Sequence, residues 1–224
     1  MVSDIGDKLS TQLSVTHSGL VHSIENYHQL RVEISQFVPE PQSPDEALWV
    51  SYYRKYRTRL EEAETVVILL SYTLVEAIAN EYIFVKADEE QYEEYEQANL
   101  LDKWEIIPSL FVPGYKFPKG VRLYQDLSRL VDWRSTYTAP KPDEFEEKAG
   151  GRPGILPEHI ADYAEFIKSC MSLPCRLFEA ISRFDQGADF AACIEASGYL
   201  VTEADGEITI TDPALLLDSS MYPE

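Results

Sequence analysis

Apolar residues lie on every side of a helix in the stretch Glu61–Val85, whose sequence is EEAETVVILLSYTLVEAIANEYIFV. A helix that is apolar all round is buried by its neighbours, so the sequence predicts a central core helix here. One line on this helix is polar, because Thr73, Glu76 and Asn80 recur three and four residues apart and share a face. A carboxylate inside a core needs a partner, which must come from elsewhere in the chain.

Further helices follow from apolar residues at helical spacing and from helix-start and helix-stop residues. They are predicted over Leu20–Phe37, from Pro44 to about Lys86, over Leu100–Leu110, over Val121–Thr138, and from Pro157 to Phe184 with a kink or restart at Pro174. Residues 1–19 are rich in Ser and Thr and are expected to be partly ordered.

The character of the chain changes after Gly187. Two short apolar runs, Tyr199–Val201 and Ile208–Ile210, flank an Asp-Gly pair, which is a hairpin pattern. The sequence therefore predicts an all-α bundle of about five or six helices with a small C-terminal β-hairpin. Residues 1–186 are expected to form the bundle and residues 187–224 a helix-hairpin appendage.

The formal charge of the chain is −20, with 19 basic and 39 acidic residues, which argues against a broad surface for nucleic acid or an anionic membrane. Ten of the basic residues nevertheless fall in two short stretches, 51–60 and 113–142. Eight of them are candidates for a basic groove: Arg54, Lys55, Arg57, Arg59, Lys116, Lys119, Arg122 and Arg129. If the two stretches are neighbours in space, this groove could hold phosphates. The alternative is internal pairing of the basic residues with acidic helices.

The cysteines and histidines predict no metal site and no cofactor. Three cysteines form neither an even disulfide framework nor a paired C-x-x-C spacing, which favours a reduced, cytoplasmic compartment. None of the four histidines has a zinc-type partner, and no phosphate-binding glycine motif occurs. The central stretch also has no uncharged run approaching the roughly 20 apolar residues of a membrane span, so no membrane partner is expected.

Arg134 continues the apolar stripe of Val121–Thr138 at four residues from Leu130. A charged side chain on such a stripe is rarely buried unless it is paired. The polar line Thr73, Glu76 and Asn80 is its natural receiver, since arginine donates two parallel hydrogen bonds to a carboxylate. The sequence therefore predicts a direct Glu76–Arg134 contact, with Asn80 bonded to one of them. Such a pair fits a structural joint between two helices or an active-site arginine.

These motifs resemble the HEPN superfamily of helical domains over roughly Leu48–Pro142. The resemblance rests on a buried helix with E-x-x-x-N, at Glu76 and Asn80, followed by a helix ending in W-R-S-T-Y-T-A-P-K-P. The last core helix of the family typically carries R-N-x-x-x-H, often before a Pro- and Lys-containing segment, which Lys141 matches here. The resemblance implies a metal-independent ribonuclease ancestry and a homodimer, which is expected through the face near Val121–Pro142.

The motif departs from the family pattern at two positions: Ser135 stands in place of asparagine, and Ala139 in place of histidine. Cleavage of RNA needs a group that moves protons, and arginine is too basic for that role. The resemblance therefore implies a degenerate, non-catalytic module that binds a partner protein or RNA, in a toxin–antitoxin or anti-phage setting. Two alternatives stay open. One is an active ribonuclease that recruits Tyr137, Glu76 or His159 as base, and the other is a helical assembly protein with no nucleic-acid role.

Overall fold

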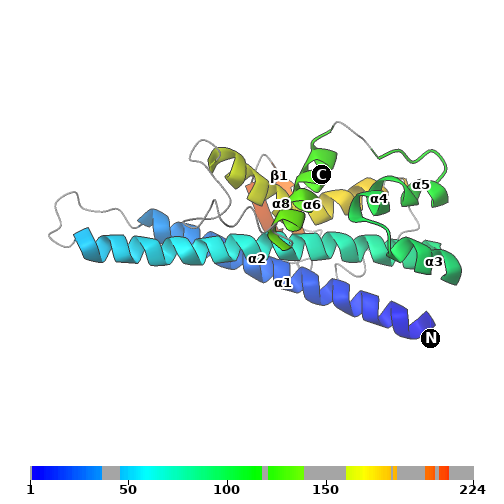
Figure 1. Ribbon diagram of the computed structural model, residues 1–224, viewed down its shortest axis with the longest axis horizontal. Coiled ribbons are helices and arrows are strands. Elements are labelled where there is room, and N and C mark those ends of the chain that lie inside the picture. The colour runs from blue at the N-terminus through cyan, green and yellow to red at the C-terminus, as the bar shows by residue number, and fades with distance from the viewer. Residues whose placement is uncertain are drawn as a thin grey trace, which may run out of the picture.

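Two long antiparallel helices, α1 (Val2–Gln36) and α2 (Glu46–Lys86), run side by side through the molecule (Figure 1). The computed structural model describes residues 2–36, 46–117, 121–138, 160–182, 184–185, 200–204 and 207–211. The long central helix expected up to Lys86 is confirmed as one continuous α2. The first helix is much longer than predicted, because residues 2–19 are helical as well.

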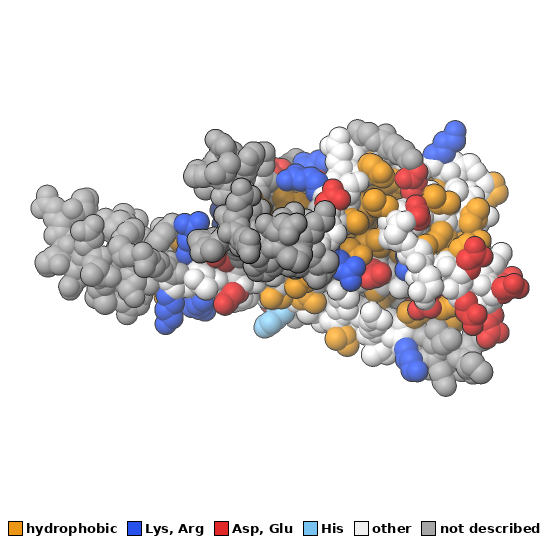
Figure 2. Space-filling model, in the orientation of Figure 1, with side chains coloured by type: hydrophobic (Ala, Val, Ile, Leu, Met, Phe, Trp, Pro, Cys, Tyr) orange, Lys and Arg blue, Asp and Glu red, His pale blue; other side chains and the backbone are white. Residues whose placement is uncertain are grey.

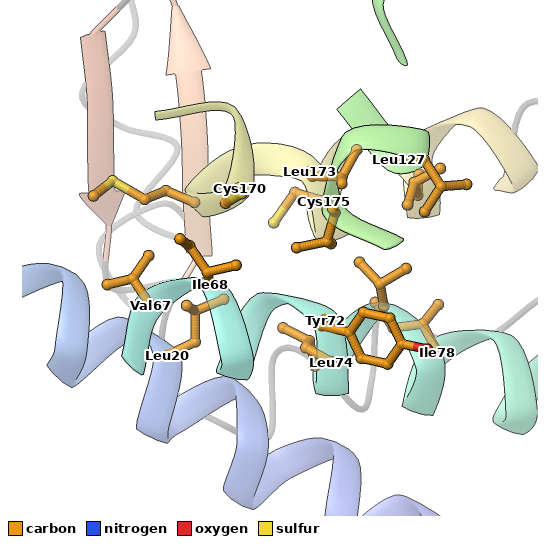
Figure 3. Close-up of a cluster of buried hydrophobic side chains, with 14 of the residues drawn as sticks. Leu20, Val67, Ile68, Tyr72, Leu74, Ile78, Leu127, Cys170, Leu173 and Cys175 are labelled. Atoms are coloured by element: carbon orange, nitrogen blue, oxygen red, sulfur yellow. The ribbon is translucent and has the colours of Figure 1, made fainter. Parts of the chain in front are cut away.

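The packing of α2 explains most of its apolar sequence. Val67, Ile68 and Ile78 are completely buried and belong to the apolar cluster drawn in Figure 3. The helix packs against α1, against α8 (Ile160–Ser182) and against the short helices that follow it. The helix is not buried all round, however, since Val66 and Leu69 are 43% and 38% exposed. By length and composition the stretch Lys55–Lys86 could cross a membrane, but 67% of its most apolar window is buried inside the fold.

Three short helices cover the C-terminal end of α2: α3 (Glu89–Glu96), α4 (Leu100–Glu105) and α5 (Ile107–Phe111). Two of them begin at side-chain caps. Asp88 accepts from the Gln91 amide and forms a capping box, and Asn99 accepts from the Asp102 amide. The caps fix where the chain turns, and Trp104 of α4 is thereby placed in the core with no exposed surface.

Two more helices, α6 (Arg122–Thr138) and α8 (Ile160–Ser182), complete the bundle on the side of α2 opposite α1 (Figure 1). Leu127 and Leu130 of α6 are completely buried, which confirms the predicted stripe. The helix α8 continues through Pro174, so the proline does not restart it. In the close-up of the core, Cys170, Leu173 and Cys175 of α8 face Ile68 and Tyr72 of α2 (Figure 3).

A two-stranded antiparallel sheet, β1 (Leu200–Ala204) and β2 (Glu207–Thr211), packs beside α8. Its register pairs Leu200 with Thr211 and Ala204 with Glu207, and the predicted turn residues Asp205 and Gly206 lie outside the described residues. These are the only strands in the part of the chain that the structure describes. The predicted fold class, an all-α bundle with a small C-terminal hairpin, is confirmed.

Candidate functional site

A row of three polar side chains follows one edge of α2, and it lies where α2 meets α4 and α6. Tyr72, Glu76 and Asn80 are spaced by four residues and therefore share a side of the helix. Arg134 of α6 reaches the Tyr72 end of the row, and Lys103 of α4 reaches the Asn80 end. The Glu76 carboxylate therefore lies between two cationic side chains, Arg134 of α6 and Lys103 of α4.

At the first end, Arg134 is held on Tyr72 in two ways. Its Nη1 donates to the phenol oxygen at 2.9 Å, and its guanidinium carbon lies 4.2 Å from the centroid of the ring. Arginine prefers such a face, because the ring quadrupole attracts the planar cation. Tyr72 is buried while Arg134 is exposed, so the ring serves as a platform that orients the guanidinium toward solvent. Burial raises the pKa of Tyr72, and nearby Glu76 raises it further.

At the second end, Lys103 is 3% exposed, and its Nζ donates to Asn80 Oδ1 at 2.7 Å. Burial lowers the pKa of this lysine, whereas the charges of Glu76 and Glu96 act in the opposite direction. The sequence prediction missed Lys103. Its position was readable, since Leu100, Lys103, Trp104 and Ile107 have the 3-4 spacing of one buried helix face.

The predicted Glu76–Arg134 ion pair is wrong. Arg134 bonds to Tyr72, one turn before Glu76, and Asn80 accepts from Lys103 instead of from either member of the expected pair. Glu76 and Asn80 were predicted to be buried, but both are half-buried. Thr73 does not take part in the pair either, because its hydroxyl donates to the carbonyl of Leu69 in its own helix. The physical reason is that the fully buried stripe of α6 ends at Leu130: Val131 and Trp133 still pack against the core on one side, but Arg134 is exposed.

The remnants of the R-N-x-x-x-H motif are only partly visible. Ser135 is exposed, and its hydroxyl donates to the Asp132 carbonyl of its own helix at 2.8 Å. Ala139, Lys141 and His159 lie outside the described residues, and so does the side chain of Tyr137.

The basic residues predicted to form a groove are largely engaged within the fold. Arg57 pairs with Glu61 at 3.2 Å, Arg122 pairs with Glu165 at 2.9 Å, and the Arg129 guanidinium stacks 5.0 Å from the centroid of the Phe166 ring. Lys55, Arg59 and Lys116 are exposed, whereas the side chains of Arg54 and Lys119 lie outside the described part of the chain. On the face shown in Figure 2, lysine and arginine side chains form separate groups and no continuous stripe.

A second polar cluster joins α6 to α8. Asp126 is 5% exposed and accepts from Arg176 Nη2 at 2.8 Å, while Arg122 Nε lies 3.7 Å from the same carboxylate oxygen. Arg176 also donates to the carbonyl of Ser169, at 3.3 Å. Because the buried Asp126 carboxylate of α6 is held by Arg176 of α8, we assign this cluster to holding the two helices together.

Within the described residues, no group of three or more histidine, cysteine, aspartate or glutamate side chains could hold a metal ion. The arrangement offers instead an oriented, solvent-facing guanidinium with a carboxylate and a buried ammonium group behind it.

Comparison of the chain with known protein families, with curated proteins and with solved structures finds no match.

Proposed function

We propose that this chain is a non-catalytic, HEPN-like helical module that binds a partner protein through the region around Arg134. The observation that carries the proposal is the Arg134–Tyr72 pair, in which an exposed guanidinium is oriented by a buried ring. An exposed guanidinium is suited to bind a carboxylate or phosphate of a partner, because its planar fork can donate two parallel hydrogen bonds. The neighbouring motif positions carry Ser135 and Ala139, neither of which can transfer a proton near neutral pH.

A protein partner is favoured over RNA by the charges around the site. Nucleic-acid surfaces need several unpaired cations along a backbone track. Here Arg57 and Arg122 are paired with carboxylates, and the chain as a whole carries −20. A single oriented arginine beside half-buried polar groups fits the hot spot of a protein interface, in which arginine is enriched. The toxin–antitoxin or anti-phage setting rests on the family resemblance, and a small nucleotidyltransferase encoded next to this chain would support it.

An active ribonuclease is the second candidate, and one observation favours it. Glu76 and Lys103 lie behind Arg134, and burial lowers the pKa of Lys103, which makes it a better proton acceptor than an exposed lysine. Lys103 is 3% exposed, however, and its ammonium group is bonded to Asn80. A phosphodiester would have to displace that contact to reach it, so we rank this candidate second.

The test measures binding and cleavage of RNA in one titration, without metal, with end-labelled structured and single-stranded RNAs. We expect no cleavage, and dissociation constants in the non-specific range of about 10⁻⁴–10⁻⁶ M that weaken with salt. The matched variants are Arg134→Ala and, as control, Arg57→Ala, which removes another exposed arginine of the bundle. Tight binding lost only in Arg134→Ala would make RNA the partner. Cleavage lost only in Arg134→Ala would establish the ribonuclease.

A further inference from the structure

One face of α2 lies outside the apolar core, and its residues recur at a regular spacing. Its positions follow an alternating 4-3 spacing, the spacing of a helix seam that packs on another helix. In chain order the seam consists of Lys55, Arg59, Glu62, Val66, Leu69, Thr73, Glu76 and Asn80. All of these side chains are exposed or half-buried, including the two apolar ones at the centre.

From this face we propose that the chain forms a homodimer in which the seam of α2 packs antiparallel on the same seam of a second copy. With the two-fold axis between Val66 and Leu69, Val66 faces the partner's Leu69. The same register sets Arg59 opposite the partner's Glu76 and Lys55 opposite the partner's Asn80. The two apolar residues would then be covered at the centre, and an opposite-charge pair would lie on each side of them.

The charges decide the direction of packing. In a parallel pair each seam residue would face its own copy, so that Arg59 would meet Arg59 and Glu62 would meet Glu62. Like charges across an interface disfavour that arrangement. Only the antiparallel register places Arg59, in the N-terminal half of the seam, against Glu76 in its C-terminal half. The seam spans about 37 Å from Lys55 to Asn80 at 1.5 Å per residue, which is long enough for an extended two-helix contact.

This surface differs from the face of residues 121–142 on which a dimer was expected. The apolar residues of α6 are used inside the bundle, since Leu127 and Leu130 are completely buried and Val131 and Trp133 pack against the same core. Among the described side chains of α6, those that are exposed are polar: Arg122, Gln125, Arg129, Asp132, Arg134 and Ser135. The α2 seam therefore offers the better self-complementary surface, and its C-terminal end, at Glu76 and Asn80, adjoins the Arg134 site.

The experiment is sedimentation equilibrium of the full chain at micromolar concentration. Wild type should be a dimer, and Arg59→Glu or Glu76→Lys should each weaken it at least about tenfold, because each puts like charges in contact twice per dimer. The double variant Arg59→Glu/Glu76→Lys should restore dimerisation, since both members of the pair are reversed in every chain. The control is Arg57→Glu, the same charge change on the same helix but off the seam, which should leave the dimer unchanged.

Glu76 is half-buried and lies near Lys103, so Glu76→Lys could disturb the fold as well as the dimer. A second variant therefore separates the two effects. Val66 is 43% exposed, so Val66→Asp should keep the helical circular dichroism spectrum while giving a monomer. A monomeric wild type would overturn the proposal. So would a dimer that tolerates Val66→Asp, or one that the double charge reversal does not restore.

Discussion

The contact between Asp126 and Arg176 gives the sharpest stability prediction. Its two side chains are 6% and 24% exposed and meet at 2.8 Å between α6 and α8. Breaking a buried ion pair by removing one partner costs about 3–5 kcal/mol, because the other charge is left without compensation. Arg176 is partly exposed and keeps its bond to the Ser169 carbonyl, so Asp126→Leu should cost about 3 kcal/mol, at the lower end of that range.

Removing the other partner, Arg176, should lower the free energy of unfolding by less. After Arg176→Met, the Asp126 carboxylate still has Arg122 Nε at 3.7 Å, so we expect about 2 kcal/mol. The double variant Asp126→Leu/Arg176→Met replaces both charges with apolar groups and should cost less than the sum of the single changes, with a coupling energy of about 2 kcal/mol. Urea unfolding followed by circular dichroism measures all three free energies.

The matched control for this cycle is the pair Arg57–Glu61, which has a similar distance, 3.2 Å, but a side-chain exposure of 65% and 30%. Arg57→Ala should change the free energy of unfolding by less than about 1 kcal/mol. Additive effects of Asp126→Leu and Arg176→Met, each no larger than this control, would show that the two residues do not meet and that α6 and α8 are joined differently.

Three further predictions concern single positions. Burial lowers the pKa of His17 from 6.5 to about 4, so between these two pH values the unfolded state binds a proton that the folded state does not. The contribution of His17 to the free energy of unfolding is therefore complete above pH 6.5, and that free energy should fall by about 3 kcal/mol as the pH drops toward 4. Urea titrations should show this loss in wild type and not in His17→Leu. Gly19→Ala should raise the free energy of unfolding by up to about 1 kcal/mol, because alanine favours the helix and its Cβ would lie 3.6 Å from Leu70, an ordinary van der Waals distance. A loss of stability would contradict the packing of α1 on α2. Tyr72→Phe keeps the ring under Arg134 and should cost less than about 1 kcal/mol, whereas Tyr72→Leu should cost clearly more; equal costs would mean that the stacking contributes nothing.

The helices were predictable because local spacing determines them. The stripe of Leu127 and Leu130 was read correctly from the sequence, and so was the continuous apolar stretch of α2. The first half of α1 was underestimated, because its buried face includes Thr16 and His17, which do not count as apolar in a periodicity argument.

The site was only partly predictable, because side-chain partners depend on where helices cross. Extending the stripe from Leu130 to Arg134 assumed that the position one turn on is also buried, and the structure shows that it is exposed. Tyr72 was then the aromatic residue within reach, one turn from the expected Glu76. Lys103 could have been predicted to lie on a buried face, but its bond to Asn80 depends on how α4 docks on α2.

We propose above all that this chain is a HEPN-like scaffold that has lost its chemistry and kept an oriented arginine. The most direct test is single-turnover cleavage of end-labelled RNA, without metal, by wild type and by the variant Ser135→Asn/Ala139→His. We predict no cleavage by wild type and gained cleavage by the restored variant, which should disappear when Arg134→Ala is added. Cleavage by wild type that Arg134→Ala abolishes would contradict the account, and a restored variant that folds but stays inactive would remove the support for the HEPN-like assignment.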